Sequence, residues 1–263
     1  MRGVSVLNHF AFGYNYRRLR FWGVDFPVHG ENSLVGAIDE FFAYLRDLDL
    51  RVTERATDRL RKIREKIKSL PADTKTDAAL AAEVTAALNF LDTTLDAELA
   101  MRTAYLPTPK RFDLDSLLVT PKNLLGEDVY VSLPDIARFD FFYACRCIAF
   151  ELPTAAAFHL MRCTEAVLRL YYNSLVLRNR ITNPMWGPII DHLRKKRQNP
   201  PPKALLDHLD NIRNNFRNPT QHPEARYTSD EAQDLLSTTV DVVNRTIRDL
   251  RSRLGLKKGQ PVP

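Results

Sequence analysis

Residues 211–223 read NIRNNFRNPTQHP and separate two stretches that carry the apolar period of a helix. Before this segment, apolar residues recur at spacings of four, three and four, namely Leu205, Leu209, Ile212 and Phe216. After it, Thr228 and Glu231 form a capping box that predicts the start of the next helix. The segment therefore predicts a connection between two amphipathic helices, and the same period elsewhere in the chain predicts an all-α fold.

A proline within the segment predicts where the first helix ends. Because the residue before a proline disfavours the helical conformation, we expect the helix to stop at Asn218 and Pro219. Arg217 then lies on the last turn, and His222 lies on the short connection. Arg213 precedes Arg217 by four residues, so we expect it on the same helix face, where it can bind RNA.

Arg217 and His222 offer the groups that cleavage of an RNA phosphodiester requires. A guanidinium group binds phosphate and keeps its charge, and a histidine transfers protons near neutral pH. RNA supplies its own nucleophile, the ribose 2′-hydroxyl, which the protein must orient and deprotonate while it stabilises the negative phosphorus centre. This scheme needs no metal and no cofactor, and it predicts 2′,3′-cyclic phosphate and 5′-hydroxyl products.

The pattern Arg217-Asn218-x-x-x-His222 resembles the motif of the HEPN superfamily, which runs from an arginine to a histidine four to six residues later. The flanking sequences RNPTQHPEARYTSDEAQDLL and ELPTAAAFHLMRCTEAVLRLYY also resemble bacterial HEPN proteins, and the resemblance extends from near Leu133 to Leu254. It implies a homodimer in which two Arg/His pairs line one RNA-cutting cleft. Arg217 and His222 would be catalytic, and Asn218 would support them. The family also implies a toxin or antiphage role, with an antitoxin or sensor as a possible partner.

Two other interpretations of the same residues remain open. The chain can be a non-catalytic HEPN-fold module for dimerisation and protein interaction, in which Arg217 and Asn218 cap helix carbonyls and His222 fixes a turn. It can also be a target of nucleotide transfer or an antitoxin-linked partner.

The helix expected over residues 154–177 carries a polar arc beside its apolar face. This arc contains His159, Arg162, Arg169 and Asn173, with Glu165 at its edge. We interpret Arg162 and Arg169 as RNA-binding residues, with Glu165 orienting one of them. The alternative is a solvated face on which Arg162, Glu165 and Arg169 form ion pairs of small energetic value.

Composition is that of a globular protein without a membrane span. The 263 residues are 44% hydrophobic and 27% charged, with a net charge of +6 and three cysteines. The first 13 residues lack the layout of a secretory signal, and few cysteines favour a reducing cytosol, so we expect a cytoplasmic protein. The basic balance is compatible with a nucleic-acid partner. Cys145 and Cys147 point to opposite sides of a helix, so no metal site is predicted.

Breaks in the apolar pattern divide the chain. We expect an aromatic-rich N-terminal arm over residues 1–31, an antiparallel helical hairpin over residues 32–105 and a connecting segment over residues 106–132. A HEPN-like helical bundle follows over residues 133–255, and residues 256–263 form a disordered tail.

Several of these segments have a predicted internal structure. In the arm, alternating aromatic residues at positions 10, 12, 14 and 16 favour a strand or extended segment packed on the helices, or a stacking surface for bases. The hairpin consists of helices over residues 33–69 and 77–103. Residues 128–132 are expected to form a brief strand, and residues 178–203 a basic connection.

Overall fold

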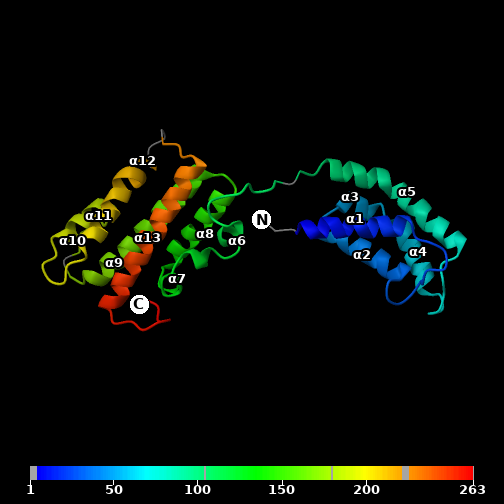
Figure 1. Cartoon of the computed structure of the whole chain (residues 1–263), viewed down its shortest axis with the longest axis horizontal. Coiled ribbons are helices and arrows are strands. Elements are labelled where there is room, and N and C mark those ends of the chain that lie inside the picture. The colour runs from blue at the N-terminus through cyan, green and yellow to red at the C-terminus, as the bar shows by residue number, and fades with distance from the viewer. Residues whose placement is uncertain (1–4, 104, 179, 221–224, 263) are drawn as a thin grey trace. The chain divides into compact units, whose positions relative to one another are not determined.

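The computed structural model describes residues 5–103, 105–178, 180–220 and 225–262, and the chain divides into two compact units, Met1–Tyr105 and Leu106–Pro263 (Figure 1). Both units are built from helices, which confirms the predicted all-α class. Within the described ranges, β structure is limited to one isolated antiparallel bridge between Pro27 and Lys75. No helix among these residues combines the length and apolarity that crossing a membrane requires.

The N-terminal unit packs five helices around one apolar core. They are α1 (Val6–Arg20), α2 (Leu34–Asp47), α3 (Arg51–Arg55), α4 (Asp58–Lys68) and α5 (Ala78–Ala100). Side-chain caps start three of them: Ser5 accepts a hydrogen bond from the Leu7 amide at 3.1 Å, Ser33 accepts one from the Gly36 amide at 3.2 Å, and Asp77 accepts one from the Leu80 amide at 2.7 Å. Apolar residues of all these helices except the short α3 meet in the core, including Leu19, Ile38, Phe41, Leu60 and Leu88.

The alternating aromatic residues of the N-terminal arm lie in helix α1, so the strand or extended segment predicted for them is wrong. Phe10 and Tyr14 are 70% and 64% exposed, whereas Phe12 and Leu19 are buried. The burial therefore follows a helical period and not the alternation of aromatic residues. The arm does pack on the helices, as expected, because Phe12 stacks on Phe41 of α2 with ring centroids 5.9 Å apart.

The helix predicted over residues 33–69 is three helices, α2, α3 and α4. The chain turns at Asp49, whose φ of 55° lies in the left-handed region that ends a helix. It turns again at Ala56 and Thr57, between α3 and α4. The apolar period continues from α2 to α4 because both of these helices bury their apolar residues in the same core. The second predicted helix is confirmed as α5.

The C-terminal unit contains the remaining helices. They are α6 (Leu114–Leu118), the 3-10 helix η1 (Pro121–Leu124), α7 (Glu127–Val131), α8 (Asp135–Ala149), α9 (Pro153–Leu175), α10 (Trp186–Arg194), α11 (Lys203–Ile212), the π-helical turn η2 (Arg213–Arg217), α12 (Asn218–Thr220) and α13 (Ser229–Arg253). The long helix α9 packs against α8, α10 and α13 (Figure 1). Large side chains such as Phe141, Tyr171 and Trp186 fill the core between these helices.

Three local expectations for this unit are corrected. Residues 128–132 fall largely in helix α7 and form no strand. The segment 178–203 includes α10, because Trp186, Ile189 and Leu193 bury their side chains in the core. The tail is tied down as far as Gln260, since the buried Arg251 guanidinium donates hydrogen bonds to the carbonyls of Lys257 and Gln260.

Helix α13 begins as predicted. The Glu231 amide donates to the Thr228 hydroxyl at 3.2 Å, and the Thr228 amide donates to the Glu231 carboxylate at 2.7 Å. These reciprocal hydrogen bonds are the predicted capping box. They fix the start of the helix directly after the segment that holds the candidate site.

Candidate functional site

The segment before the candidate motif contains a π-helical turn. The amide of Asn218 donates to the carbonyl of Arg213, five residues earlier, and Asn218 itself is helical with φ −65° and ψ −50°. The predicted helix end at Asn218 is therefore wrong. A proline ring clashes with the carbonyl four residues before it in a regular helix, and the wider π turn relieves that clash ahead of Pro219. Such turns are rare and are frequent at functional sites.

The π turn separates two arginines that the regular helical period would place on one face. The Arg213 guanidinium lies 3.0 Å from an Asp210 oxygen and rests against the backbone of Gly187, where a Cβ atom would lie only 2.1 Å away. The Arg217 guanidinium instead lies 3.7 Å from a Glu165 carboxylate oxygen on α9. Arg213 and Arg217 therefore do not share a face, and Arg213 is directed to α10.

Glu165 connects Arg217 to a second arginine. Its other oxygen accepts a hydrogen bond of 2.7 Å from Arg169, one turn further along α9. The side chains of Glu165 and Arg217 are 19% and 20% exposed, whereas that of Arg169 is 49% exposed. The structure thus brings together Arg217, Arg169 and Glu165, with two guanidinium groups in contact with one carboxylate.

Arg162 belongs to a different cluster from the one predicted. Its Nε lies 3.1 Å from Asp140 on α8, and the other oxygen of Asp140 lies 2.8 Å from Nδ1 of His159. Asp140 is fully buried. Sequence reasoning missed Asp140, although a carboxylate on the otherwise apolar face of a helix demands a cationic partner.

The remaining motif residues differ in how far the structure describes them. Asn218 is exposed at the first position of α12. His222 lies outside the described residues, so its catalytic role stays a prediction.

Tyr227 is a second residue that sequence reasoning missed. Its hydroxyl lies 2.7 Å from the Thr220 hydroxyl and donates to the Phe216 carbonyl at 3.2 Å. Its amide donates to the Thr154 hydroxyl at 3.3 Å, near the start of α9. Tyr227 thereby holds the π turn and α12 against the helix that carries Glu165.

The cysteines offer no reactive thiolate. Burial raises the pKa of Cys145 to about 12 and also raises the pKa of Cys163. Among the described residues, no group of three or more His, Cys, Asp or Glu side chains lies together as in a metal site.

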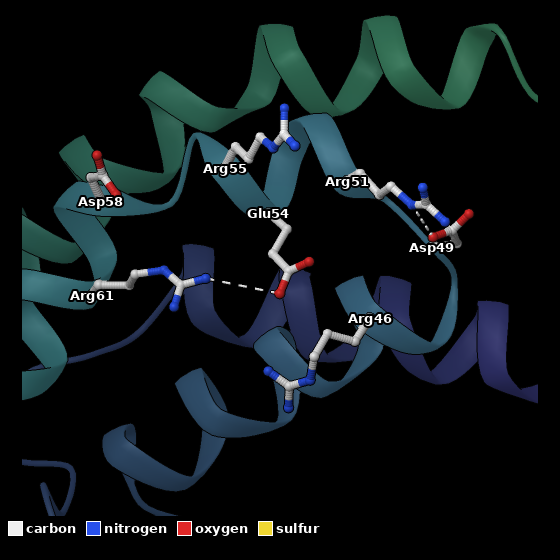
Figure 2. Close-up of a pocket in the computed structure, with 7 residues that line it drawn as sticks. All are labelled: Arg46, Asp49, Arg51, Glu54, Arg55, Asp58 and Arg61. Atoms are coloured by element: carbon white, nitrogen blue, oxygen red, sulfur yellow. Dashed lines mark hydrogen bonds and ion pairs between the residues drawn. The ribbon is translucent and has the colours of Figure 1, made fainter.

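The N-terminal unit has an open hollow of about 700 Å³ between α2 and α4, lined by charged residues (Figure 2). Arg51 pairs with Asp49 at 2.6 Å, and Arg61 reaches Glu54 at 3.9 Å. Four arginines and three carboxylates line the hollow, so their charges nearly balance: Arg46, Asp49, Arg51, Glu54, Arg55, Asp58 and Arg61.

Comparison with known proteins yields no relative. No family model, no curated protein and no solved structure matches the chain.

Proposed function

We propose that the chain is a metal-independent endoribonuclease with a HEPN-like C-terminal bundle, acting as a homodimer in a toxin or antiphage role. Arg217 binds and stabilises the scissile phosphate, His222 moves protons, and Asn218 supports the pair. The observation that carries the proposal is the cluster of Arg217 and Arg169 around Glu165, next to a π turn.

The charge of this cluster suits a phosphate. Two guanidinium groups contact one carboxylate, and a guanidinium group is a cation that binds phosphate. The contact between Arg217 and Glu165 is long, at 3.7 Å, and partly exposed ion pairs are weak. The contact with Glu165 therefore holds the Arg217 guanidinium only weakly, and the planar fork of this group matches two phosphate oxygens.

The rival function is a non-catalytic module for dimerisation and protein interaction. Exposed aromatic side chains on the C-terminal unit favour it, such as Phe139 and Phe158, which are 50% and 46% exposed. In that case Arg217 and Glu165 would only join α9 to the π turn.

The test is RNA cleavage by the purified chain in EDTA, on substrates that include transfer RNA and messenger RNA. We expect cleavage to survive chelation and to leave 2′,3′-cyclic phosphate ends. Arg217→Ala and His222→Ala should each lower the rate by about 100- to 1,000-fold, as loss of a group that stabilises the transition state does. Arg245→Ala is the matched control, because Arg245 is exposed on α13 and its carboxylate partner among the described residues is Asp241.

Two outcomes would contradict the proposal. Cleavage that persists in both variants would place the active site elsewhere. If no RNA is cut while the variants stay folded and dimeric like the wild type, the interaction module is the better description.

A further inference from the structure

Three aromatic side chains lie half exposed on neighbouring faces of α8 and α9. Phe139, Tyr143 and Phe158 are 50%, 39% and 46% exposed, and we call them the aromatic patch. The rings of Phe139 and Tyr143 lie 4.5 Å apart, and Tyr143 stacks on His159 with centroids 5.9 Å apart. The patch is therefore a continuous aromatic surface and not a set of scattered apolar residues.

Cations border this surface. The Arg162 guanidinium lies over the Phe158 ring at 5.8 Å, and the Arg146 guanidinium lies over the Phe142 ring at 4.3 Å. Within the part of the chain that the structure describes, Arg146 has no carboxylate partner. An anion that approaches the patch therefore meets positive charge on two sides.

A buried carboxylate, Asp140, orients Arg162 and His159 at the patch without facing the solvent. Asp140 is fully buried and holds Nε of Arg162 and Nδ1 of His159. Arg162 uses its Nε for this contact, and among the described residues no hydrogen bond engages its two Nη groups, which can therefore bind a ligand. The exposed side of the cluster is thus aromatic and cationic.

We propose that the aromatic patch, with Arg162 and His159, binds a single-stranded segment of RNA that flanks the bond to be cut. This inference rests on the proposed function. Bases stack on the rings and phosphates bind the cations, which is how proteins hold single strands without reading a sequence. Arg162 and Arg169 are two turns apart on α9, or about 10 Å along its axis. The patch therefore binds nucleotides beside the scissile phosphate and not the phosphate itself.

Charge favours RNA over a second copy of the chain as the occupant. A two-fold interface places the same surface on both sides, so Arg146 and Arg162 would meet a surface that carries the same positive charges. Asp135, an exposed carboxylate four residues before Phe139, cannot offset this charge freely because it is already paired with Arg138. A polyanion meets no such repulsion.

The experiment measures binding of a labelled 2′-O-methyl RNA oligonucleotide to the full chain by fluorescence anisotropy. This probe lacks a free 2′-hydroxyl and cannot be cut, so binding is measured apart from cleavage. We expect Phe158→Ala and Tyr143→Ala each to weaken single-strand binding by about 5- to 150-fold. A duplex of the same sequence should bind the wild type more weakly, because its bases are already paired and stacked.

Phe90→Ala is the matched control. Phe90 is a 52% exposed aromatic residue of the N-terminal unit, with the Arg59 guanidinium 4.3 Å above its ring. This variant should bind like the wild type. Circular dichroism should show all three variants folded, because the side chains removed are exposed.

The proposal fails if the patch variants bind the oligonucleotide as tightly as Phe90→Ala does. It also fails if they change only the mass of the assembly in solution, since the patch would then be a subunit interface. Loss of binding in these variants supports RNA binding by the patch even if unmodified RNA is never cut. In that case only the proposed ribonuclease activity is contradicted.

Discussion

Glu98 projects from α5 into the N-terminal unit and accepts hydrogen bonds at the start of α3. The amides of Val52 and Thr53 donate to it at 3.1 and 2.8 Å, and the Thr53 hydroxyl donates at 2.7 Å. Burial by itself raises the pKa of Glu98, but these hydrogen bonds and the nearby Arg102 outweigh it, so the pKa lies below its ordinary 4.5. Helix α3 has no side-chain cap of its own, and Glu98 supplies one from another helix.

We expect Glu98→Gln to destabilise the protein by about 1–3 kcal/mol at pH 7, because buried amides lose a charged acceptor. Urea unfolding followed by circular dichroism measures the change. Asp96→Asn is the control, since Asp96 is exposed on the same helix and should change stability by less than about 0.5 kcal/mol.

The same variant makes a prediction about pH. A carboxylate with a lowered folded pKa stabilises the fold above its unfolded pKa, and this contribution is lost as pH falls through the folded value. The difference in stability between wild type and Glu98→Gln should therefore be full at pH 7 and shrink below pH 4.5. A difference that stays constant down to pH 3 would show that the charge of Glu98 does not matter.

At the scale of the helix, the apolar period predicted which segments are helical but not where they bend. Residues 33–69 look continuous because α2 and α4 bury their apolar residues in one core, whereas Val52 of α3 is 60% exposed. The φ of 55° at Asp49 marks the first break. The N-terminal arm misleads because the aromatic residues at 10, 12, 14 and 16 alternate, while burial follows residues 12, 15 and 19. A local pattern of residues cannot show whether tertiary contacts will favour the two-residue period of a strand or the 3.6-residue period of a helix.

The candidate site was predictable only in part. The contact between Glu165 and Arg169 follows from their spacing on one helix, whereas the contact between Glu165 and Arg217 was not predicted. The π turn was not predicted, because Pro219 can either end a helix or be accommodated by a wider turn, and the sequence does not show which of the two occurs. The contacts of Tyr227 join segments far apart in the chain, so they too require the fold.

An element-scale prediction concerns Tyr227, which holds the π turn in place under the proposed ribonuclease function. Tyr227→Phe removes hydrogen bonds to Thr220 and the Phe216 carbonyl and should lower stability by about 1 kcal/mol. We expect the kcat of RNA cleavage to fall about tenfold, because a rise of about 1.4 kcal/mol in the activation free energy lowers a rate tenfold.

Rates at saturating RNA, compared with urea unfolding, separate positioning from stability in this variant. Tyr130→Phe is the control, since the Tyr130 hydroxyl makes no hydrogen bond within the described residues. Equal kcat values for Tyr227→Phe and wild type would show that Tyr227 does not position the site.

At the scale of the molecule, each unit has a core of its own. The cluster around Phe41 and Leu88 and the cluster around Phe141 and Trp186 have no residue in common. The boundary falls between Tyr105 and Leu106, which are 86% and 76% exposed and contribute to neither core. Chains of about 100 to 160 residues can bury enough surface to fold alone.

We therefore expect residues 1–105 and residues 106–263 to fold when produced separately. Each fragment should be helical and unfold cooperatively in urea, with a stability within about 1 kcal/mol of its value in the full chain, because little of either core is lost. If the proposed function holds, residues 106–263 should retain the cleavage activity. The control is a second pair of fragments, obtained by dividing the chain after Leu152. This division separates α8 from α9, which share one core, so the C-terminal core is split and should not unfold cooperatively in either fragment. If residues 106–263 also lack a cooperative transition, the C-terminal core depends on the N-terminal unit and the division into independent units is wrong.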